Sequence, residues 1–233
     1  IDGNLKGVEV LLTSPAFNKA LINKRDPDDG KTPLYVACES GHAEVVKLLL
    51  QHGADPNKRR QSCTSSFRAE GPLHVAAKQG NLAILRMLIE GGADVNLDSG
   101  LSRTALLIAV SGGVMEVVEA LLQAGALTDI AERHRGCTPL HKACMSGSAE
   151  VAQRLVRAGA RYDIKNKAGK TALEIAKEKG MSDVVALIVQ SFPPSAAVFR
   201  HSRHSREHHN HNNHNPQSWR TAGRECGITV RTN

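Results

Sequence analysis

Two kinds of residue recur along this chain in one shared register, and this periodicity constrains the fold more than any other feature. A series of alanines is spaced by 39, 33, 34 and 33 residues, and glycines four positions later keep the same spacing. The alanines are Ala37, Ala76, Ala109, Ala143 and Ala176, and the glycines are Gly41, Gly80, Gly113, Gly147 and Gly180. A second glycine series is Gly53, Gly92, Gly125 and Gly159. Such a period indicates stacked units that each contact only their neighbours.

Each unit carries the signals of two short helices. Thr32 is suited to cap the start of a first helix, and Pro33 occupies the first helical position, where no amide donor is needed. Gly41 favours the left-handed backbone that ends such a helix. Apolar residues at helical spacing within 45–49 predict a second helix, which Gly53 ends. A pair of this size cannot bury its own apolar face, so the units must stack.

Composition and charge narrow the class of protein. Only 3% of the residues are aromatic, so Leu, Val, Ile and Ala must fill the core, which suits small repeated helices. No apolar run reaches the roughly 18 residues of a membrane-spanning helix, and we expect no membrane insertion. Five widely spaced cysteines, an odd number, favour a reducing compartment, so we expect the cytoplasm or the nucleus. The formal net charge is +7.

One short motif identifies the repeat. Residues Thr138–Ala143 read Thr-Pro-Leu-His-Lys-Ala, and Pro72–Ala76 reproduces most of this motif. In a period of about 33 residues the motif resembles the ankyrin repeat. The resemblance covers residues 1–190 and implies an all-α ankyrin-repeat solenoid of helix-turn-helix units with hairpin-like finger loops.

The resemblance also suggests how the chain is divided. We expect a partial N-terminal repeat and then five helix pairs in residues 1–190, followed by a disordered tail rich in His, Asn and Arg at 191–233. Because the partial repeat has only its second half and the chain starts at Ile1, we also expect a fragment of a longer protein.

The resemblance implies a protein partner and a place for it. Ankyrin-like proteins bind through the finger tips and the exposed face of the first helices, which line a concave groove. Carried over position by position, the candidate surface is Asp28, Asp29, Lys31, Glu39, Phe67, Arg68, Glu70, Lys78, Gln79, Leu101, Arg103, His134, Arg135, Met145, Lys170 and Lys179. The connection within 58–70 is longer than the period requires, which indicates either a larger contact ledge or a neutral change of loop length.

The charge of this surface changes along the stack. It is mainly acidic in the first repeat and mainly basic from Arg68 onward. We therefore expect an extended partner segment that is acidic where it meets the second to fifth repeats. Phe67, Leu101 and Met145 would supply apolar anchors. The alternative is that each charge is a solvated surface residue. The hypothesis predicts loss of binding when three arginines are changed to glutamate: Arg68, Arg103 and Arg135.

No motif supports catalysis, a cofactor or a metal. Cys137, His141 and Cys144 are potential zinc ligands, but a zinc site needs a fourth ligand, and in ankyrin-like proteins this histidine hydrogen-bonds backbone near the finger. Gly30-Lys31-Thr32 resembles the end of a phosphate-binding loop, yet the glycine required five residues before the Gly-Lys pair is absent. We therefore predict a non-catalytic, monomeric adaptor or scaffold.

Two other functions stay open. The chain could be the substrate-recognition arm of a larger effector, such as a ubiquitin ligase receptor, a kinase or a channel. A C-terminal ligase-recruiting box is not matched, because Trp219 stands where leucine is expected and Cys226 lies too far away. The second alternative is nucleic-acid or metal contact through the basic tail, which has six histidines within 201–215. Between these partners, we expect a protein rather than a nucleic acid.

Overall fold

The computed structural model describes residues 5–14, 21–61 and 69–191. These ranges contain eleven helices and no strand beyond an isolated bridge between Lys165 and Thr171. The helices are α1 (Leu5–Thr13), α2 (Pro33–Glu39), α3 (Ala43–Gln51), α4 (Pro72–Gln79), α5 (Leu82–Glu90), α6 (Ala105–Gly112), α7 (Met115–Gln123), α8 (Pro139–Ser146), α9 (Ala149–Arg157), α10 (Ala172–Glu178) and α11 (Ser182–Ser191). The predicted all-α repeat fold is confirmed.

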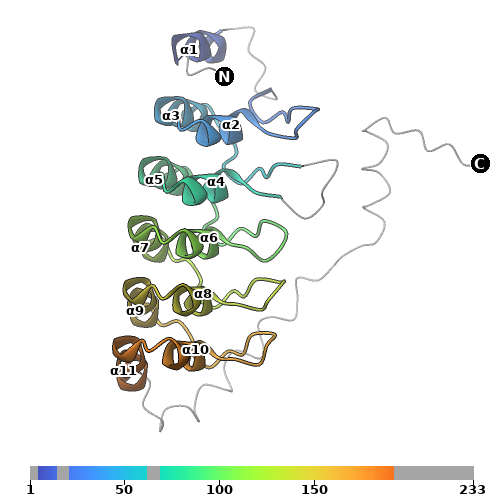
Figure 1. Ribbon diagram of the computed structural model, residues 1–233. Coiled ribbons are helices and arrows are strands. Elements are labelled where there is room, and N and C mark those ends of the chain that lie inside the picture. Colours follow the sequence, from blue (N-terminus) through green and yellow to red (C-terminus); the bar gives the residue numbers. More distant parts are fainter. Residues whose placement is uncertain (1–4, 15–20, 62–68, 192–233) are drawn as a thin grey trace, which may run out of the picture. The chain divides into compact units, whose positions relative to one another are not determined.

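The helices form two rows (Figure 1). The first helices of the repeats, α2, α4, α6, α8 and α10, pack on one another in order, and each packs on the second helix of its own repeat. The second helices, α3, α5, α7, α9 and α11, form the other row. Repeats one to five are therefore the pairs from α2–α3 to α10–α11. Helix α1 packs on α3, in the row of second helices, where the sequence predicted the second half of a repeat.

The first helices begin where the threonines predict. A threonine hydroxyl accepts from the backbone N–H three residues later in four repeats: Thr32 from Tyr35 at 3.2 Å, Thr104 from Leu107 at 3.4 Å, Thr138 from His141 at 3.4 Å and Thr171 from Glu174 at 3.2 Å. Each bond satisfies an amide that has no partner within the helix. In repeat two Gly71 takes the cap position, and the His74 ring supplies the bond to the cap instead.

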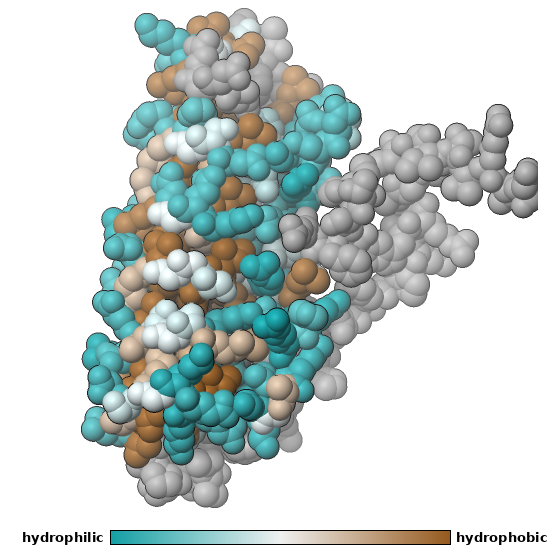
Figure 2. Space-filling view, viewed as in Figure 1, coloured by the Kyte–Doolittle hydropathy of each residue, from teal (hydrophilic) through white to brown (hydrophobic). Residues whose placement is uncertain are grey.

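The core lies between the two rows. The five alanines of the repeat register are each 0% exposed, so their small side chains set how closely neighbouring helices approach. Leucines one turn earlier fill the space beside them: Leu34, Leu73, Leu106 and Leu140. Figure 2 shows hydrophobic residues running down the middle of the stack, between hydrophilic second helices and hydrophilic fingers.

Backbone hydrogen bonds join each finger to the next. Four N–H groups donate across the fingers: Gln61 to the Gly30 carbonyl at 3.2 Å, Ala69 to Ser99 at 3.0 Å, Arg133 to Leu101 at 3.0 Å and Lys167 to Arg135 at 2.9 Å. The fingers therefore form a connected edge, in which the backbone of each finger is held against the backbone of the next.

Polar side chains also join the loops that follow the second helices. In four loops an Asn or Asp oxygen accepts from a backbone N–H of the next repeat: Asn23 from Asp55 at 2.8 Å, Asn57 from Asp94 at 2.7 Å, Asn96 from Leu127 at 2.8 Å and Asp129 from Arg161 at 2.9 Å. Asn57 and Asn96 thus help to fix the stacking register of the repeats.

Some expectations fall outside the described residues. The tail lies beyond them except for Ser191, which ends α11, and residues 62–68 of the long connection also lie outside. None of the helices in the described part of the chain has the length and apolar character needed to cross a membrane.

Candidate protein-binding face

A surface formed by the fingers and the first helices carries most of the predicted site residues. We define this finger–helix face as the described finger residues 28–31, 69–70, 101–103, 133–137 and 167–170 together with the ends of the first helices at 39–40, 78–79, 111–112, 145–146 and 178–179. One pair of positions recurs in every repeat: the finger residue directly before the helix cap and the helix residue eight positions later. The finger residues are Lys31, Glu70, Arg103, Cys137 and Lys170, and the helix residues are Glu39, Lys78, Ser111, Met145 and Glu178.

In three repeats the two positions of the face meet directly. The Lys31 ammonium lies 2.7 Å from a carboxylate oxygen of Glu39, and the Lys170 ammonium donates to both carboxylate oxygens of Glu178 at 2.8 Å. In repeat four the sulfur atoms of Cys137 and Met145 lie 3.9 Å apart. The spacing of eight residues therefore brings a finger side chain against the last turn of its own first helix.

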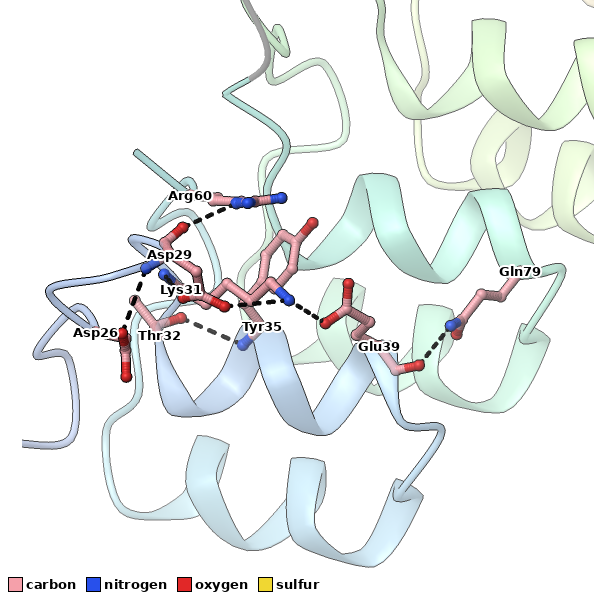
Figure 3. Close-up of polar contacts among 8 residues, drawn as sticks. All are labelled: Asp26, Asp29, Lys31, Thr32, Tyr35, Glu39, Arg60 and Gln79. Atoms are coloured by element: carbon pink, nitrogen blue, oxygen red, sulfur yellow. Dashed lines mark hydrogen bonds and ion pairs between the residues drawn. The ribbon is translucent and has the colours of Figure 1, made fainter. Parts of the chain in front are cut away.

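The end of the face at repeat one is a closed polar network (Figure 3). The Lys31 ammonium lies 3.2 Å from Asp29 Oδ2 as well as 2.7 Å from Glu39, and 5.9 Å from the centre of the Tyr35 ring. The hydrogen bond to Glu39 raises the pKa of Lys31, although partial burial opposes this. The Arg60 guanidinium donates to the Asp29 carbonyl at 2.9 Å. Lys31 therefore engages both Asp29 and Glu39, and the three side chains together carry a formal charge of −1.

Two further predicted residues adjoin this network. Gln79 donates its side-chain amide to the Glu39 carbonyl at 2.6 Å, so it links α4 to the end of α2. Asp28 is exposed in the first finger, where its N–H donates to Asp26 Oδ1 at 2.8 Å. Of the three acidic residues predicted in repeat one, Asp28 is the one that has no ion pair among the residues described.

The charged side chains in the middle of the face have no ion pairs among the described residues. Glu70, Lys78 and Arg103 lie around one hollow between repeats two and three. In the described part of the chain, none of these three side chains has an ion pair. Arg103 is partly exposed, and Lys78 is exposed. Positive charge is thus available to a partner here, in contrast to repeat one.

Repeat four combines apolar and basic contributions. Met145 is 37% exposed at the end of α8, and Leu101 of the neighbouring finger is partly exposed. His134 and Arg135 are exposed on finger four, next to Lys167 of finger five through the backbone bond between them. In repeat five Lys179 is exposed, whereas Lys170 is engaged by Glu178. Phe67 and Arg68 lie outside the described residues.

Sequence reasoning missed an ion pair on the floor of the face. The Lys142 ammonium lies 2.7 Å from Glu132 Oε1, with side-chain exposures of 21% and 12%. The signal was present in the repeat register: the positions that correspond to Lys142 are apolar elsewhere, namely Val36, Val75, Ile108 and Ile175. A lone lysine at an apolar position calls for a nearby carboxylate.

Removing one member of this pair should destabilise the fold. We expect Lys142→Met to lower the free energy of unfolding by about 1–3 kcal/mol, because the Glu132 carboxylate would be left nearly buried without a cation. The double variant Lys142→Met/Glu132→Gln should recover much of this loss. Urea unfolding followed by circular dichroism measures both, and equal losses in the single and double variants would contradict the assignment.

Two buried histidines, in the first helices of repeats two and four, each hold the finger of the next repeat. His74 Nδ1 accepts from the Gly71 N–H at 3.1 Å, and its Nε2 donates to the Leu97 carbonyl at 2.9 Å. His141 Nδ1 accepts from the Thr138 N–H at 3.2 Å, and its Nε2 donates to the Lys170 carbonyl at 3.1 Å. This confirms the expected backbone contact of His141. Burial lowers the pKa of both imidazoles, which keeps them neutral with the proton on Nε2.

The cysteines near His141 are placed for packing. Cys144 is 0% exposed, and burial raises its pKa to about 12, so it is neither a nucleophile nor a ready metal ligand. Within the described ranges, no three His, Cys, Asp or Glu side chains come together in a way that could hold a metal ion. Both nitrogens of the His141 ring are already engaged by the finger backbone.

Stacked helix pairs with a connected row of fingers define a class of solenoid repeat domain. Comparison with known proteins places this chain within that class. Residues 29–61 match the model of the ankyrin repeat, and residues 60–132 and 127–196 each match the model of three ankyrin repeats. The chain therefore belongs to the ankyrin-repeat family, whose repeats are protein–protein interaction modules.

Similar proteins differ widely in what they carry besides the repeats. The palmitoyltransferase ZDHHC13 of Homo sapiens is 39% identical over 158 residues, which covers 67% of this chain and 24% of that protein. Ankyrin repeat and SOCS box protein 16 of Homo sapiens is 36% identical over 177 residues, covering 72% and 37%. Transient receptor potential cation channel subfamily A member 1 of Homo sapiens is 31% identical over 172 residues, covering 70% and 15%. The match thus spans well under half of each relative.

Proposed function

We propose that this chain is a non-catalytic adaptor or scaffold that holds an extended, acidic segment of a protein partner against the finger–helix face of repeats two to five. The observation that carries the proposal is the distribution of unpaired charge along this face. Lys31 and Lys170 are paired with glutamates at the two ends, whereas Lys78, Arg103 and Arg135 have no ion pair among the described residues. Positive charge in the middle of the face, between two ends whose lysines are already paired, favours an acidic partner segment.

Charge reversal on this face tests the proposal. The full chain and its Arg103→Glu/Arg135→Glu variant serve as baits for affinity capture with mass spectrometry, and recovered partners are then measured by titration. We expect the variant to bind an identified partner about 10- to 100-fold more weakly, because two attractions become repulsions. Added salt should weaken binding of the wild type more than that of the variant.

The matched control carries the same charge change on the opposite row. Lys47 and Arg86 are exposed on the second helices α3 and α5, away from the fingers. Lys47→Glu/Arg86→Glu should therefore bind like the wild type. If this control loses the partner equally, net charge rather than the finger–helix face controls binding. If neither variant loses it, the partner lies elsewhere on the molecule.

The length of the relatives supports a second candidate function. Their matched regions make up 5% to 37% of their own length. We therefore infer, as the alternative, that the chain is the recognition arm of a longer effector. Sequencing the full transcript around this coding region tests the alternative directly. An adjoining catalytic, membrane or ligase-recruiting domain would support the arm, and its absence would favour the adaptor.

A further inference from the structure

A hollow of about 270 Å³ lies on the finger–helix face between repeats two and three. Six residues line it: Glu70, Lys78, Arg103, Ile108, Ser111 and Gly112. Two cations and one carboxylate therefore surround the space, and Ile108, which is 6% exposed, forms an apolar part of its wall. The lining comes from two fingers and two first helices, α4 and α6.

The hollow exists because repeat three has the smallest side chains at two positions of the face. The residues that correspond to Ser111 are Glu39, Lys78, Met145 and Glu178. The residues that correspond to Gly112 are Ser40, Gln79, Ser146 and Lys179. A β-carbon added at Gly112 would come no nearer than 3.8 Å to a neighbouring atom, the Val114 Cγ2, so packing does not require glycine there. The glycine leaves space on the surface instead.

Because Ser111 stands where repeats one and five have a glutamate, Arg103 has no carboxylate at the paired position of its own repeat. In repeats one and five the finger lysine pairs with the glutamate eight residues later, at 2.7 Å and 2.8 Å. In repeat three this position is Ser111, whose hydroxyl donates to the Leu107 carbonyl at 2.8 Å and is therefore turned to its own helix. In repeat two the signs are exchanged, and no ion pair joins Glu70 to Lys78 in the part of the chain that the structure describes.

The geometry points to this hollow as the site that receives one acidic side chain of the partner, with Arg103 as the residue that determines specificity. A carboxylate can accept two parallel hydrogen bonds from a guanidinium, which no lysine on the face can offer. Lys78 adds a second positive charge, and Ile108 can contact the methylene groups of the incoming side chain. This inference rests on the proposed function. It assigns one anchoring site for the partner within the finger–helix face.

Ser111→Glu is the sharpest test, because it installs in repeat three the internal pair that repeats one and five already have. Arg103 stays in place, but the new glutamate should occupy its guanidinium and fill the hollow. Ser40→Glu is the matched control, because it adds the same charge to an exposed serine on the same face in repeat one. Arg103→Gln is a second variant that removes the charge without adding a side chain to the hollow.

The probe is a synthetic peptide of alternating glycine and glutamate, titrated into the isotope-labelled full chain at low ionic strength and followed by NMR. We expect saturable shifts of the Arg103 guanidinium signal and of the Ser111 and Gly112 amides. Ser111→Glu and Arg103→Gln should weaken binding at least about tenfold, whereas Ser40→Glu should change it less than about threefold. The matching glycine–glutamine peptide and inorganic phosphate should not reproduce the response, which separates an acidic peptide from a free anion.

Two results would overturn the inference, and they can be told apart. Saturable shifts confined to other parts of the finger–helix face, or equal binding by Ser111→Glu, would remove the anchor and leave the proposed function standing. Shifts on the second helices, or no saturable binding, would count against both. Amide spectra of each variant before titration show whether it is folded.

Discussion

Gly30→Ala should lower the free energy of unfolding by about 2–5 kcal/mol, because alanine meets two separate penalties at this position. Gly30 has a φ of +68°, in the left-handed region that disfavours a β-carbon. The added β-carbon would also lie 1.6 Å from the carbonyl oxygen of Gln61. The two fingers would have to separate, which would break the hydrogen bond from the Gln61 N–H to the Gly30 carbonyl.

A second glycine isolates the steric part of this effect. Gly41 has a φ of +74°, but a β-carbon there would meet nothing within 4 Å. Gly41→Ala should therefore show the conformational penalty alone, about 1 kcal/mol. Urea unfolding of the full chain, followed by circular dichroism, gives both values. Equal losses would show that fingers one and two are not in close contact at Gly30.

The sequence predicts the fold well because the signals of this fold are local. Thr32 and Pro33 mark a helix start, and the period of about 33 residues sets how many pairs must stack. The hydrogen bonds between fingers are not visible in the same way, because each joins residues of different repeats through their backbones. Gly30 and Gly41 look alike in the sequence, yet only Gly30 is enclosed by the next finger.

The candidate face was predictable in its residues but not in their pairing. Asp29 and Glu39 were expected to give repeat one an acidic contact surface, and the structure brings both to Lys31. Residue type indicates a charge, whereas its availability to a partner depends on neighbours that the fold supplies. The hollow beside Arg103 was equally hard to predict, because it arises where Ser111 and Gly112 have smaller side chains than the equivalent residues of the other repeats. Comparing equivalent positions of the repeats reveals it, but only once the spacing of eight residues is known to place two side chains face to face.

Acid should destabilise this domain through its two buried histidines. His74 and His141 are 1% and 0% exposed, and burial lowers the pKa of each below the ordinary value of 6.5. Below pH 6.5 the unfolded chain binds protons at these rings, whereas the folded chain does not until the lower pKa is reached. Their contribution to stability is therefore present above pH 6.5 and is lost as the pH falls through the folded-state pKa values.

We expect the free energy of unfolding to fall between pH 7.5 and pH 5.5, by at most about 1.4 kcal/mol for each histidine and each pH unit below the unfolded pKa. Repeat three supplies the control, because Leu107 occupies the same position there without a finger hydrogen bond. His74→Leu/His141→Leu should be less stable than the wild type at pH 7.5, because several backbone groups lose their partners. Its stability should change much less with pH over this window.

The carboxyl groups of Asp29 and Glu174, whose pKa values are lowered from 3.8 and 4.5, lose their own contribution to stability only in more acidic solution. Urea unfolding of both proteins across the window measures the two slopes. Parallel slopes would show that His74 and His141 are not the neutral, doubly bonded rings that hold these fingers.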